Sequence, residues 1–387
     1  MYSGKYVFSQ VLDFVDQYEF NKCVKRYFGN YRVRDLNCWN QFVQLFFGQL
    51  TSLNSLNSIC LCLKAHKGKL YHLGIKQYVV VSTLSRANEN RDWRIIADFG
   101  YYLIFKVRPL YAECSIPKLN IDNEVFALDS TTISVSINLC TWAEGKYSRG
   151  AVKMHTLLNL RGSIPEFILI TDGKYHDSNA LDEFAPETNA IYLMDKAYVD
   201  FEALYRVNQA QAFFVTRAKS TMKYKVVEQN FNIDQTTGLR TDKTVMLTIE
   251  KSKRLYPEKL RLVEYYDNVN DELLVFLSNN FDVSALEIAN LYKNRWQIEV
   301  FFKWIKQNLR IKKLWGYSVN AVKTHLWIAV CTYLIVAYMK YELDSNYSVY
   351  EIMQILGVSA FDKTPIRDLL CEQRQFNQNV KEQLSLF

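Results

Sequence analysis

The most constraining feature of the chain is a series of apolar segments between residues 124 and 216, separated by turn and helix signals. Five of them have the composition of strands: 124–130, 152–160, 165–171, 190–195 and 212–216. A turn sequence joins the second and third, whereas helical segments at 177–184 and 201–210 separate the later ones. This order predicts an α/β sheet that begins antiparallel and continues parallel, with helices on both faces.

The sequence on either side of this series changes character and divides the chain. Before it, a helical pattern includes a capped helix that follows Ser82 and is expected to run without a break as far as Pro109. After it comes basic, polar, strand-like sequence, and a helical pattern resumes at Ser284. We therefore expect five parts: a helical region 1–109, the first part of a sheet domain 110–216, a β-rich basic insertion 217–280, the last helix of the sheet domain 281–315, and a helical region 316–387.

Positive charge is concentrated in two places, although the formal net charge is only +7 over 387 residues. Residues 217–261 contain 11 basic and 5 acidic residues, and residues 292–313 contain 7 basic residues and a single acid, Glu299. Clustered cations suit an anionic polymer such as nucleic acid. A solvated, lysine-rich surface is the alternative.

Several other classes of site and segment are not favoured. The eight cysteines lack the paired spacing of a zinc site, and Cys60-Leu-Cys62 reads as part of a buried apolar segment. No signal peptide is indicated at the N-terminus. The longest apolar run, 327–339, is shorter than the ~20 residues that cross a bilayer. We expect this run to be a core helix, and we expect no membrane association.

Two of the predicted strands end in an acid. Asp129 follows Phe126-Ala-Leu, and Asp195 follows Tyr192-Leu-Met. A carboxylate at the end of a buried strand needs a partner, for which a divalent cation is suited. A turn or cap residue is the alternative for each acid, and Asp195 could cap a helix that begins near Tyr198.

A third acid lies on a predicted amphipathic helix. At 100° per residue, a polar stripe about 80° wide runs along this helix. Its members are Tyr292, Arg295, Glu299, Lys303, Lys306 and Arg310. A surface helix in which Glu299 pairs with Arg295 and Lys303 is the alternative, but it leaves the other cations without acidic partners.

The spacing Tyr292-x2-Arg295-x3-Glu299-x6-Lys306 resembles the Y-R-E-K signature of bacterial insertion-sequence transposases with a DDE, ribonuclease-H-like catalytic domain. ALDSTT, which contains Asp129, and MDKAY, which contains Asp195, resemble the two aspartate blocks of the same group. The similarity extends over essentially the whole chain. It implies a ribonuclease-H-like mixed sheet interrupted by the β-rich insertion, preceded by a DNA-end-recognition domain at 1–109.

The resemblance also implies a site that uses two metal ions. Asp129, Asp195 and Glu299 would be the catalytic residues and would bind two Mg2+ ions, for which Mn2+ can substitute. The resemblance and the helical geometry together name DNA contacts. The signature positions Tyr292, Arg295 and Lys306 come from the resemblance, and Lys303 and Arg310 from the geometry alone. In the N-terminal region, Arg86, Arg91 and Arg94 are candidate contacts with the DNA end.

The function that the resemblance implies is that of a DNA transposase. Such a protein binds the terminal inverted repeats of its insertion element and catalyses cleavage and strand transfer by cut-and-paste, with hairpin ends as one route. The implied partners are double-stranded DNA, at transposon ends and target, and a second copy in a homodimeric synaptic complex. The expected location is the bacterial cytoplasm, at the nucleoid. An inactive DNA-binding descendant and a nuclease without strand transfer are the alternatives.

Two smaller features stay open. Some relatives stack a flipped base on a tryptophan of the insertion, but residues 217–290 contain none. Tyr256, Tyr265 or Tyr266 could take that part, or could be core residues of strands. His176-Asp177 also fits the family pattern, with a helix cap as the alternative for Asp177.

Overall fold

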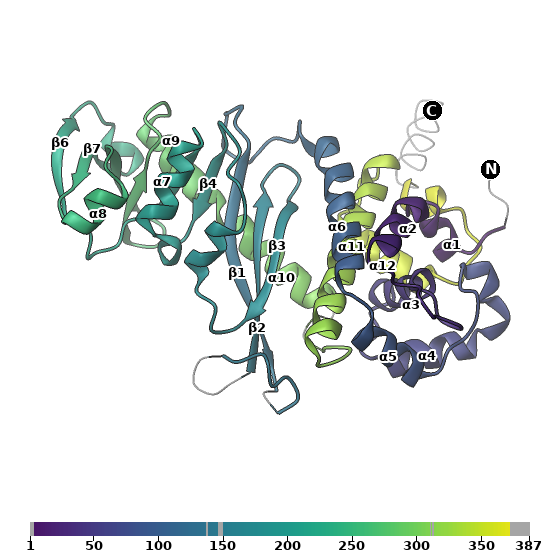
Figure 1. The fold of residues 1–387 in the computed structure, drawn as a ribbon. Helices are drawn as coiled ribbons and strands as arrows, with labels where there is room; N and C mark the ends of the chain where they lie inside the picture. The colour runs from purple at the N-terminus through teal and green to yellow at the C-terminus, as the bar shows by residue number, and fades with distance from the viewer. Residues whose placement is uncertain (1–3, 137, 146–149, 310, 312, 372–387) are drawn as a thin grey trace, which may run out of the picture. The chain divides into compact units, whose positions relative to one another are not determined.

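The chain forms two compact units in the computed structural model, which describes residues 4–136, 138–145, 150–309, 311 and 313–371. The first unit comprises Met1–Leu110, Asn138–Trp142 and Lys303–Phe387, and the second comprises Tyr111–Ile137 and Ala143–Phe302. Figure 1 labels the helices and most of the strands of both units.

The first unit is helical, as the apolar spacing predicts. Its N-terminal helices are α1 Val7–Leu12, α2 Gln17–Arg26, α3 Cys38–Leu50, α4 Leu56–Ala65, α5 Val81–Asn90 and α6 Arg94–Val107. Two more come from the C-terminal part of the chain: α11 Val319–Glu342 and α12 Val349–Ser359. Helix α11 packs against α3, α5, α6 and α12 and forms the centre of this unit.

Helix α11 is long and apolar enough to cross a membrane, but 83% of its most apolar window is buried inside the protein. Trp327 shows how closely it packs: a Cβ added at Gly100 on α6 would lie 2.7 Å from two ring atoms of Trp327. A glycine is therefore needed at this crossing. The burial confirms that residues 327–339 belong to a core helix.

One helix boundary differs from the prediction. The expected continuous helix from Ser82 to Pro109 is two helices, α5 and α6, because the chain breaks at residues 91–93. Asn320 on α11 holds this break, since its Nδ2 donates to the carbonyls of Asn88 and Arg91 and its Oδ1 accepts from the amide of Trp93. A polar side chain from a distant segment has replaced the intrahelical bonds.

The second unit is built on a mixed sheet of nine strands (Figure 1). The first five are β1 Val125–Val135, β2 Gly150–Asn159, β3 Ile164–Asp172, β4 Ile191–Met194 and β5 Phe213–Arg217. The insertion adds β6 Tyr224–Asn230, β7 Leu239–Leu247, β8 Leu260–Asp267 and β9 Glu272–Ser278. The order across the sheet is β3-β2-β1-β4-β5-β9-β8-β7-β6. Within the residues that the structure describes, only the β1–β4 and β4–β5 pairs are parallel, so the predicted antiparallel start and parallel continuation are confirmed.

Helices cover both faces of this sheet. Leu277 belongs to the core cluster that includes Leu204 of α7 (Phe201–Gln209), whereas its neighbour Phe276 packs on Tyr292 of α9 (Ala285–Asn294) with ring centroids 4.9 Å apart. Adjacent residues of a strand point to opposite faces. Helices α7 and α9 therefore lie on opposite faces, which confirms the predicted α/β class, and every residue of the central strand β4 is buried.

Candidate active site

Two acids emerge side by side from the centre of the sheet. The parallel pairing of β1 with β4 ends at Leu128 and Met194, so Asp129 is the next residue of β1 and Asp195 directly follows β4. Asp129 therefore lies inside β1, which runs on to Val135, and not at the end of the strand as predicted. Asp195 occupies the N-cap position of the short 3-10 helix Lys196–Tyr198 but makes no side-chain cap bond, and α7 is capped by Asp200 instead. The alternative role of Asp195 as a helix cap is therefore excluded.

The third acid lies just beyond a break between two helices. Helix α9 ends at Asn294, α10 runs from Trp296 to Asn308, and Arg295 lies between them. The amide of Arg295 donates to the carbonyl of Tyr292, so the backbone tightens there instead of continuing the α-helical ladder. The prediction of one continuous helix is thus wrong: Tyr292 is near the end of α9, and Glu299 is in the first turn of α10.

Arg295 bridges two of the three acids. Its Nη1 donates to Asp129 Oδ2 at 3.0 Å and its Nη2 donates to Glu299 Oε1 at 2.6 Å. The Arg295 side chain is only 16% exposed, so these charge-assisted bonds lie in a largely dry setting. The guanidinium therefore neutralises two carboxylates that would otherwise repel each other.

Burial and neighbouring charges shift the pKa of Asp129. Burial raises the pKa of Asp129 to about 6, and the negative charges of Glu299 and Asp195 add to the rise. The amide of Ser130, which donates to Asp129 Oδ1 at 2.7 Å, and the charge of Arg295 oppose it. A pKa raised by both burial and like charges marks a site where an added cation would be favourable.

Tyr292 faces the remaining acid. Its hydroxyl lies 3.5 Å from Asp195 Oδ1, at the long limit of a hydrogen bond. Burial raises the pKa of Tyr292 to about 12, so the hydroxyl keeps its proton and can donate. The structure thus brings together Tyr292, Arg295, Asp129, Asp195 and Glu299, which the sequence spreads over 171 positions.

A polar cluster that the sequence did not predict supports Asp129. Asp177 Oδ1 accepts from Ser130 Oγ at 2.8 Å and from Lys153 Nζ at 3.2 Å, and lies 3.7 Å from Nδ1 of the fully buried His155. Burial lowers the pKa of His155 to about 4, so this ring is neutral near pH 7. We call these four residues the Asp177 cluster. The sequence signals for it were the polar residues 153 and 155 in an apolar strand and the His176-Asp177 pair, which fits the family pattern.

Asp177 is therefore not a helix cap. The 3-10 helix Asp177–Asp182 has His176 at its cap position, with no side-chain cap bond. Asp177 instead ties the start of that helix to β1, through the residue after Asp129. This is a positioning contact, because Asp177 reaches Asp129 only through Ser130.

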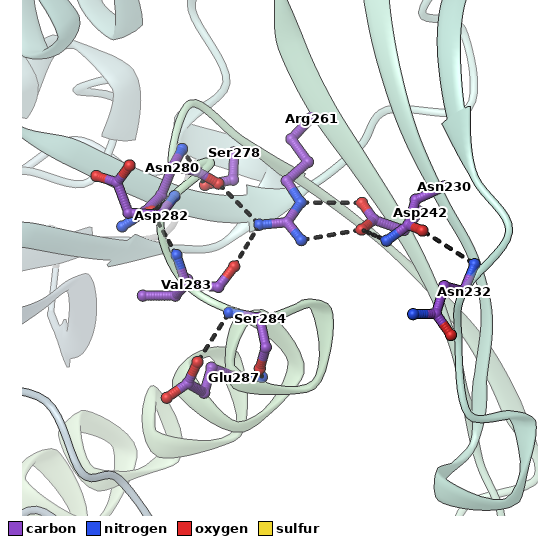
Figure 2. A network of polar contacts seen from close by, with 10 residues as sticks. All are labelled: Asn230, Asn232, Asp242, Arg261, Ser278, Asn280, Asp282, Val283, Ser284 and Glu287. Atoms are coloured by element: carbon purple, nitrogen blue, oxygen red, sulfur yellow. Dashed lines mark hydrogen bonds and ion pairs between the residues drawn. The ribbon is translucent and has the colours of Figure 1, made fainter.

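The insertion fixes the start of α9 through a buried ion pair, drawn in Figure 2. Arg261 on β8 donates from Nε and Nη2 to the two oxygens of Asp242 on β7, at 2.9 Å each. Its Nη1 donates to the carbonyl of Val283 at 2.6 Å and to that of Asn280 at 3.2 Å. Ser284 follows at once and begins α9 with a capping box. The insertion thus anchors the segment that leads directly into α9, the helix that carries Tyr292 (Figure 2).

Three predicted DNA contacts lie further along the chain. On α10, Lys303 is exposed and Lys306 is partly buried. Arg310 lies outside the described residues.

The tyrosines considered for base stacking are placed differently from one another. Tyr256 and Tyr265 are 1% and 8% exposed, so they are core residues. Tyr266 lies under Arg240, whose guanidinium is 5.2 Å from its ring centroid. The exposed aromatic side chain near the acids is Trp296, 63% exposed in the first turn of α10. It lies outside the insertion, to which the sequence-based expectation of a stacking residue applied.

The residue types at the site suggest a metal ion, but their present arrangement does not form a complete metal site. Asp129, Asp195 and Glu299 offer hard carboxylate oxygens, the ligands that Mg2+ prefers. Among the described residues, no three His, Cys, Asp or Glu side chains are grouped so as to hold a metal ion as they stand. Arg295 takes the position of a counter-ion between two of the acids. The residue types therefore fit a divalent cation, provided that this guanidinium moves.

Two proteins that are named as transposases are similar in sequence to this chain. The chain is 35% identical over 209 residues to a protein of Sinorhizobium fredii named as transposase y4zB, covering 53% of this chain and 58% of that protein. It is 30% identical over 215 residues to a protein of Geobacillus stearothermophilus named as a transposase for insertion sequence element IS5377, covering 55% of each. The chain thus spans little more than half the length of these two relatives.

A third relative and a solved structure are more distant. A protein of Synechocystis named as a transposase for insertion sequence element IS4SA is 26% identical, over 74% of this chain and 79% of its own. The piggyBac transposase in a synaptic complex with hairpin DNA is similar with a TM-score of 0.44 and 10% identity, covering 92% of this chain and 78% of that one. This last likeness is too weak to carry an argument.

Family models account for two segments. Residues 3–76 match a domain of unknown function (DUF4372). Residues 121–335 match the transposase DDE domain, and this match includes all three acids, Tyr292 and Arg295. Because the second match extends over more than half of the chain, the protein belongs to the DDE transposase family.

Proposed function

We propose that this protein is a DNA transposase that binds the terminal inverted repeats of its insertion element and catalyses strand cleavage and strand transfer. The observation that carries the proposal is the convergence of Asp129, Asp195 and Glu299 on Arg295 and Tyr292, within a family of DDE transposases. Acids from two strands and a helix meet here, at the carboxyl end of the parallel strands, where open α/β sheets commonly bind ligands.

Asp129, Asp195 and Glu299 are the proposed ligands of two Mg2+ ions, which Mn2+ can replace. When bound, the metal would activate the attacking oxygen and stabilise the leaving oxygen of a phosphodiester. The raised pKa of Asp129 supports this assignment, because a cation near Asp129 would relieve the repulsion from Glu299 and Asp195.

Arg295 and Tyr292 are the proposed contacts with DNA phosphates. A planar guanidinium pairs with phosphate oxygens through two parallel hydrogen bonds, and the protonated Tyr292 hydroxyl can donate another. Lys303, Lys306 and Arg310 extend the same proposal along the chain. Arg295 thus has two alternative partners, the carboxylates that it contacts here and the phosphates of a bound strand.

Double-stranded DNA is the proposed partner, at the transposon ends and at the target. The excess of basic residues in 217–261 supports backbone contacts by the insertion. We further propose that two copies act together in the synaptic complex, in the bacterial cytoplasm at the nucleoid. Residues 1–109 are proposed to recognise the DNA end.

The test is cleavage of DNA that carries the ends of the element, with Mg2+ or Mn2+, by wild type and Glu299→Gln. The expected result is that wild type nicks at the end, whereas the variant binds the DNA but does not cut it. Glu202→Gln, an exposed acid on α7, is the matched control and should cut like wild type. Equal cutting by wild type and Glu299→Gln would refute the assignment of Glu299. Binding without cutting by wild type would favour an inactive DNA-binding descendant.

A further inference from the structure

A pocket in the helical unit has no role in the site described above. It is an open hollow of about 600 Å3 between the α2–α3 loop (residues 27–37) and helix α5. Its lining combines aromatic side chains with guanidinium groups: Phe28, Tyr31, Arg32, Arg34, Arg86 and Arg91. We call it the loop pocket. Its volume lies within the ~300–1,000 Å3 of sites that bind small organic molecules.

The loop is firmly anchored although its side chains are exposed. A Cβ added at Gly29 would lie 2.5 Å from Ile95 Cδ1 and 2.7 Å from Cys38 Sγ, so the backbone presses directly on the core. Asn30 Oδ1 accepts from the amide of Cys38 at 2.8 Å, which ties the loop to the first residue of α3. The backbone of the loop is therefore held in place, and it fixes the positions from which the exposed side chains project.

The same loop carries backbone strain and exposed apolar surface. Phe28 and Arg32 have φ values of 51° and 54°, in the left-handed region that residues with side chains seldom adopt. Phe28 is 79% exposed and Tyr31 is 70% exposed. Strained residues commonly gather at binding sites, and exposed aromatic side chains on a fixed loop gain by contact with a ligand.

The charges of the loop pocket are mostly unpaired. Arg34 and Arg86 have no hydrogen-bond or ion-pair partner within the part of the chain that the structure describes. The guanidinium of Arg32 lies 5.1 Å from the ring centroid of Tyr31. Two acids also line the pocket: Asp92 is paired with Arg94 outside the lining, and Asp35 is exposed. Four arginines against two acids leave the pocket cationic.

The three N-terminal arginines that the sequence named as candidate DNA contacts differ in their partners. Of the three arginines predicted there, Arg94 is committed to Asp92, and Arg91 donates to Gln41 Oε1 at 2.8 Å. Arg86 alone is exposed and unpaired in the described structure. It shares the loop pocket with Arg34, which the sequence did not single out.

We infer that the loop pocket binds one unpaired nucleotide of DNA, with the base stacked on Tyr31 or Phe28 and its phosphates held by Arg34 and Arg86. Stacking on an aromatic side chain requires a base that has left its own stack, and guanidinium groups suit phosphate oxygens. A duplex offers phosphates but no free base face, so it would not explain the exposed aromatic rings. The choice of DNA among anionic ligands rests on the proposed function, whereas the pocket itself does not involve the acids of the sheet.

The test measures binding of the full chain to a fluorescein-labelled oligothymidine, of a length within the ~4–16 nucleotides of single-strand binding sites. A blunt duplex of equal length is the comparison. Tyr31→Ala should weaken binding of the single strand about 5- to 100-fold and leave duplex binding nearly unchanged. Tyr31→Trp should bind the single strand about as well as wild type. Arg34→Ala and Arg86→Ala should each weaken binding of the single strand and lower the slope of log K against log salt by roughly 0.7.

Matched controls distinguish binding of an unpaired nucleotide from other modes of anion binding. Arg367→Ala removes an exposed arginine of the same unit outside the pocket and should leave both affinities unchanged. The inference is overturned if Tyr31→Ala has no larger effect than Arg367→Ala. It is equally overturned if single strand and duplex weaken by the same factor, which would indicate a duplex phosphate surface, or if an acidic peptide competes as well as the oligonucleotide. Glu299→Gln should bind the single strand normally, so a failure of the catalytic proposal would not affect this result.

Discussion

The guanidinium of Arg295 donates a 3.0 Å hydrogen bond to Asp129, a residue 166 positions earlier in the chain. The same side chain donates to Glu299 one helical turn later. Two acids that repel each other are thereby held together around a buried positive charge. A metal ion that binds these acids must compete with Arg295 for the same oxygens, so the affinity of the site for metal depends on the alternative partners of this arginine.

Arg295→Gln is expected to raise the affinity for Mn2+ without DNA, by roughly tenfold, or about 1.4 kcal/mol. The substitution removes both the competitor for the carboxylates and a positive charge that repels the ion. Titration of bound Mn2+ by electron paramagnetic resonance measures this directly. Arg206→Gln, which removes an exposed arginine paired with Asp182, is the control and should have no effect. A lower affinity in Arg295→Gln would mean that the arginine organises the ligands instead of competing with metal.

The raised pKa of Asp129 predicts a pH dependence. Below about pH 6 this carboxyl is mostly protonated and cannot bind a cation, so the rate of Mg2+-dependent cleavage should rise as the pH increases through about 6. Its pKa is 3.8 when unperturbed, so the folded protein binds this proton more tightly than the unfolded chain does. The contribution of Asp129 to the free energy of unfolding should therefore fall as the pH rises from about 4 to about 6.

Cleavage rates measured across that range test this second prediction. At sub-saturating Mg2+, a midpoint near pH 4 would contradict the raised pKa of Asp129; saturating Mg2+ would itself lower the midpoint, because metal and proton compete for the same carboxylate. Thermal unfolding of wild type and Asp129→Asn without metal provides the companion measurement, because the variant lacks the titrating group. The difference in stability between the two proteins should change over the same pH window.

Trp296 provides a third prediction, because it is 63% exposed in the turn of α10 that carries Glu299. Trp296→Ala should leave the thermal unfolding temperature unchanged and weaken binding of the transposon end about 5- to 100-fold, through loss of a stacking surface. Fluorescence anisotropy with labelled end DNA measures the loss. Val300→Ala removes another exposed apolar side chain on α10, 52% exposed, and should bind like wild type. A similar loss in both variants would argue against stacking by the tryptophan.

Elements of the fold were predictable from the sequence where they depend on neighbouring residues, and not where they depend on residues far apart in the chain. Strands β2 to β5 were predictable, because each is a local apolar run ended by turn residues, whereas β1 continues to Val135, beyond its predicted end at residue 130. The break at Arg295 was not, because its φ of −53° and ψ of −30° are helical and leave the apolar period nearly intact. The break between α5 and α6 depends on Asn320, over 200 positions away. Such contacts appear only once the fold is known.

The site shows the same limit. The three acids could be named by spacing and resemblance, but the partners that orient them depend on strand register. Ser130 lies opposite His155 in the β1–β2 pair, and Lys153 lies two residues before His155 on β2. This pairing places both beside Asp177, which local sequence suggested as a helix cap. A capping prediction considers only adjacent residues, whereas the cluster requires three separate segments.

The Asp177 cluster leads to a fourth prediction. Asp177→Ala should lower the free energy of unfolding by about 1–3 kcal/mol, because it leaves the Lys153 ammonium, only 13% exposed, without its anionic partner. Urea unfolding measures the change. A double-mutant cycle with Ser130→Ala should give a coupling above about 0.5 kcal/mol, as residues in one hydrogen-bond network do. Asp182→Ala, an exposed acid in the same 3-10 helix, should change stability by less than about 0.5 kcal/mol. Equal effects of the two substitutions would contradict the cluster.

The buried pair Arg261–Asp242 provides the last prediction, since its side chains are 9% and 8% exposed. Arg261→Met should lower the free energy of unfolding by about 3–5 kcal/mol, because Asp242 is left as a buried, uncompensated charge. Arg261→Met combined with Asp242→Leu should recover a large part of that loss, since no isolated charge remains. The more exposed pair Arg217–Glu272, with side chains 29% and 50% exposed, is the matched control in the same sheet. Its disruption by Arg217→Met should have an effect of about 0–1 kcal/mol.

Cleavage by the double variant distinguishes two roles of Arg261: positioning α9 and stabilising the fold. Arg261 also binds the carbonyls of Asn280 and Val283, just before α9 begins, and the double variant lacks these bonds even where its stability recovers. If the insertion positions α9, the double variant should unfold near the wild-type urea concentration and still cut DNA more slowly, since Tyr292 and Arg295 follow from the start of that helix. Wild-type cleavage by the double variant would show that the pair contributes to stability alone and that the capping box of Ser284 suffices to place α9.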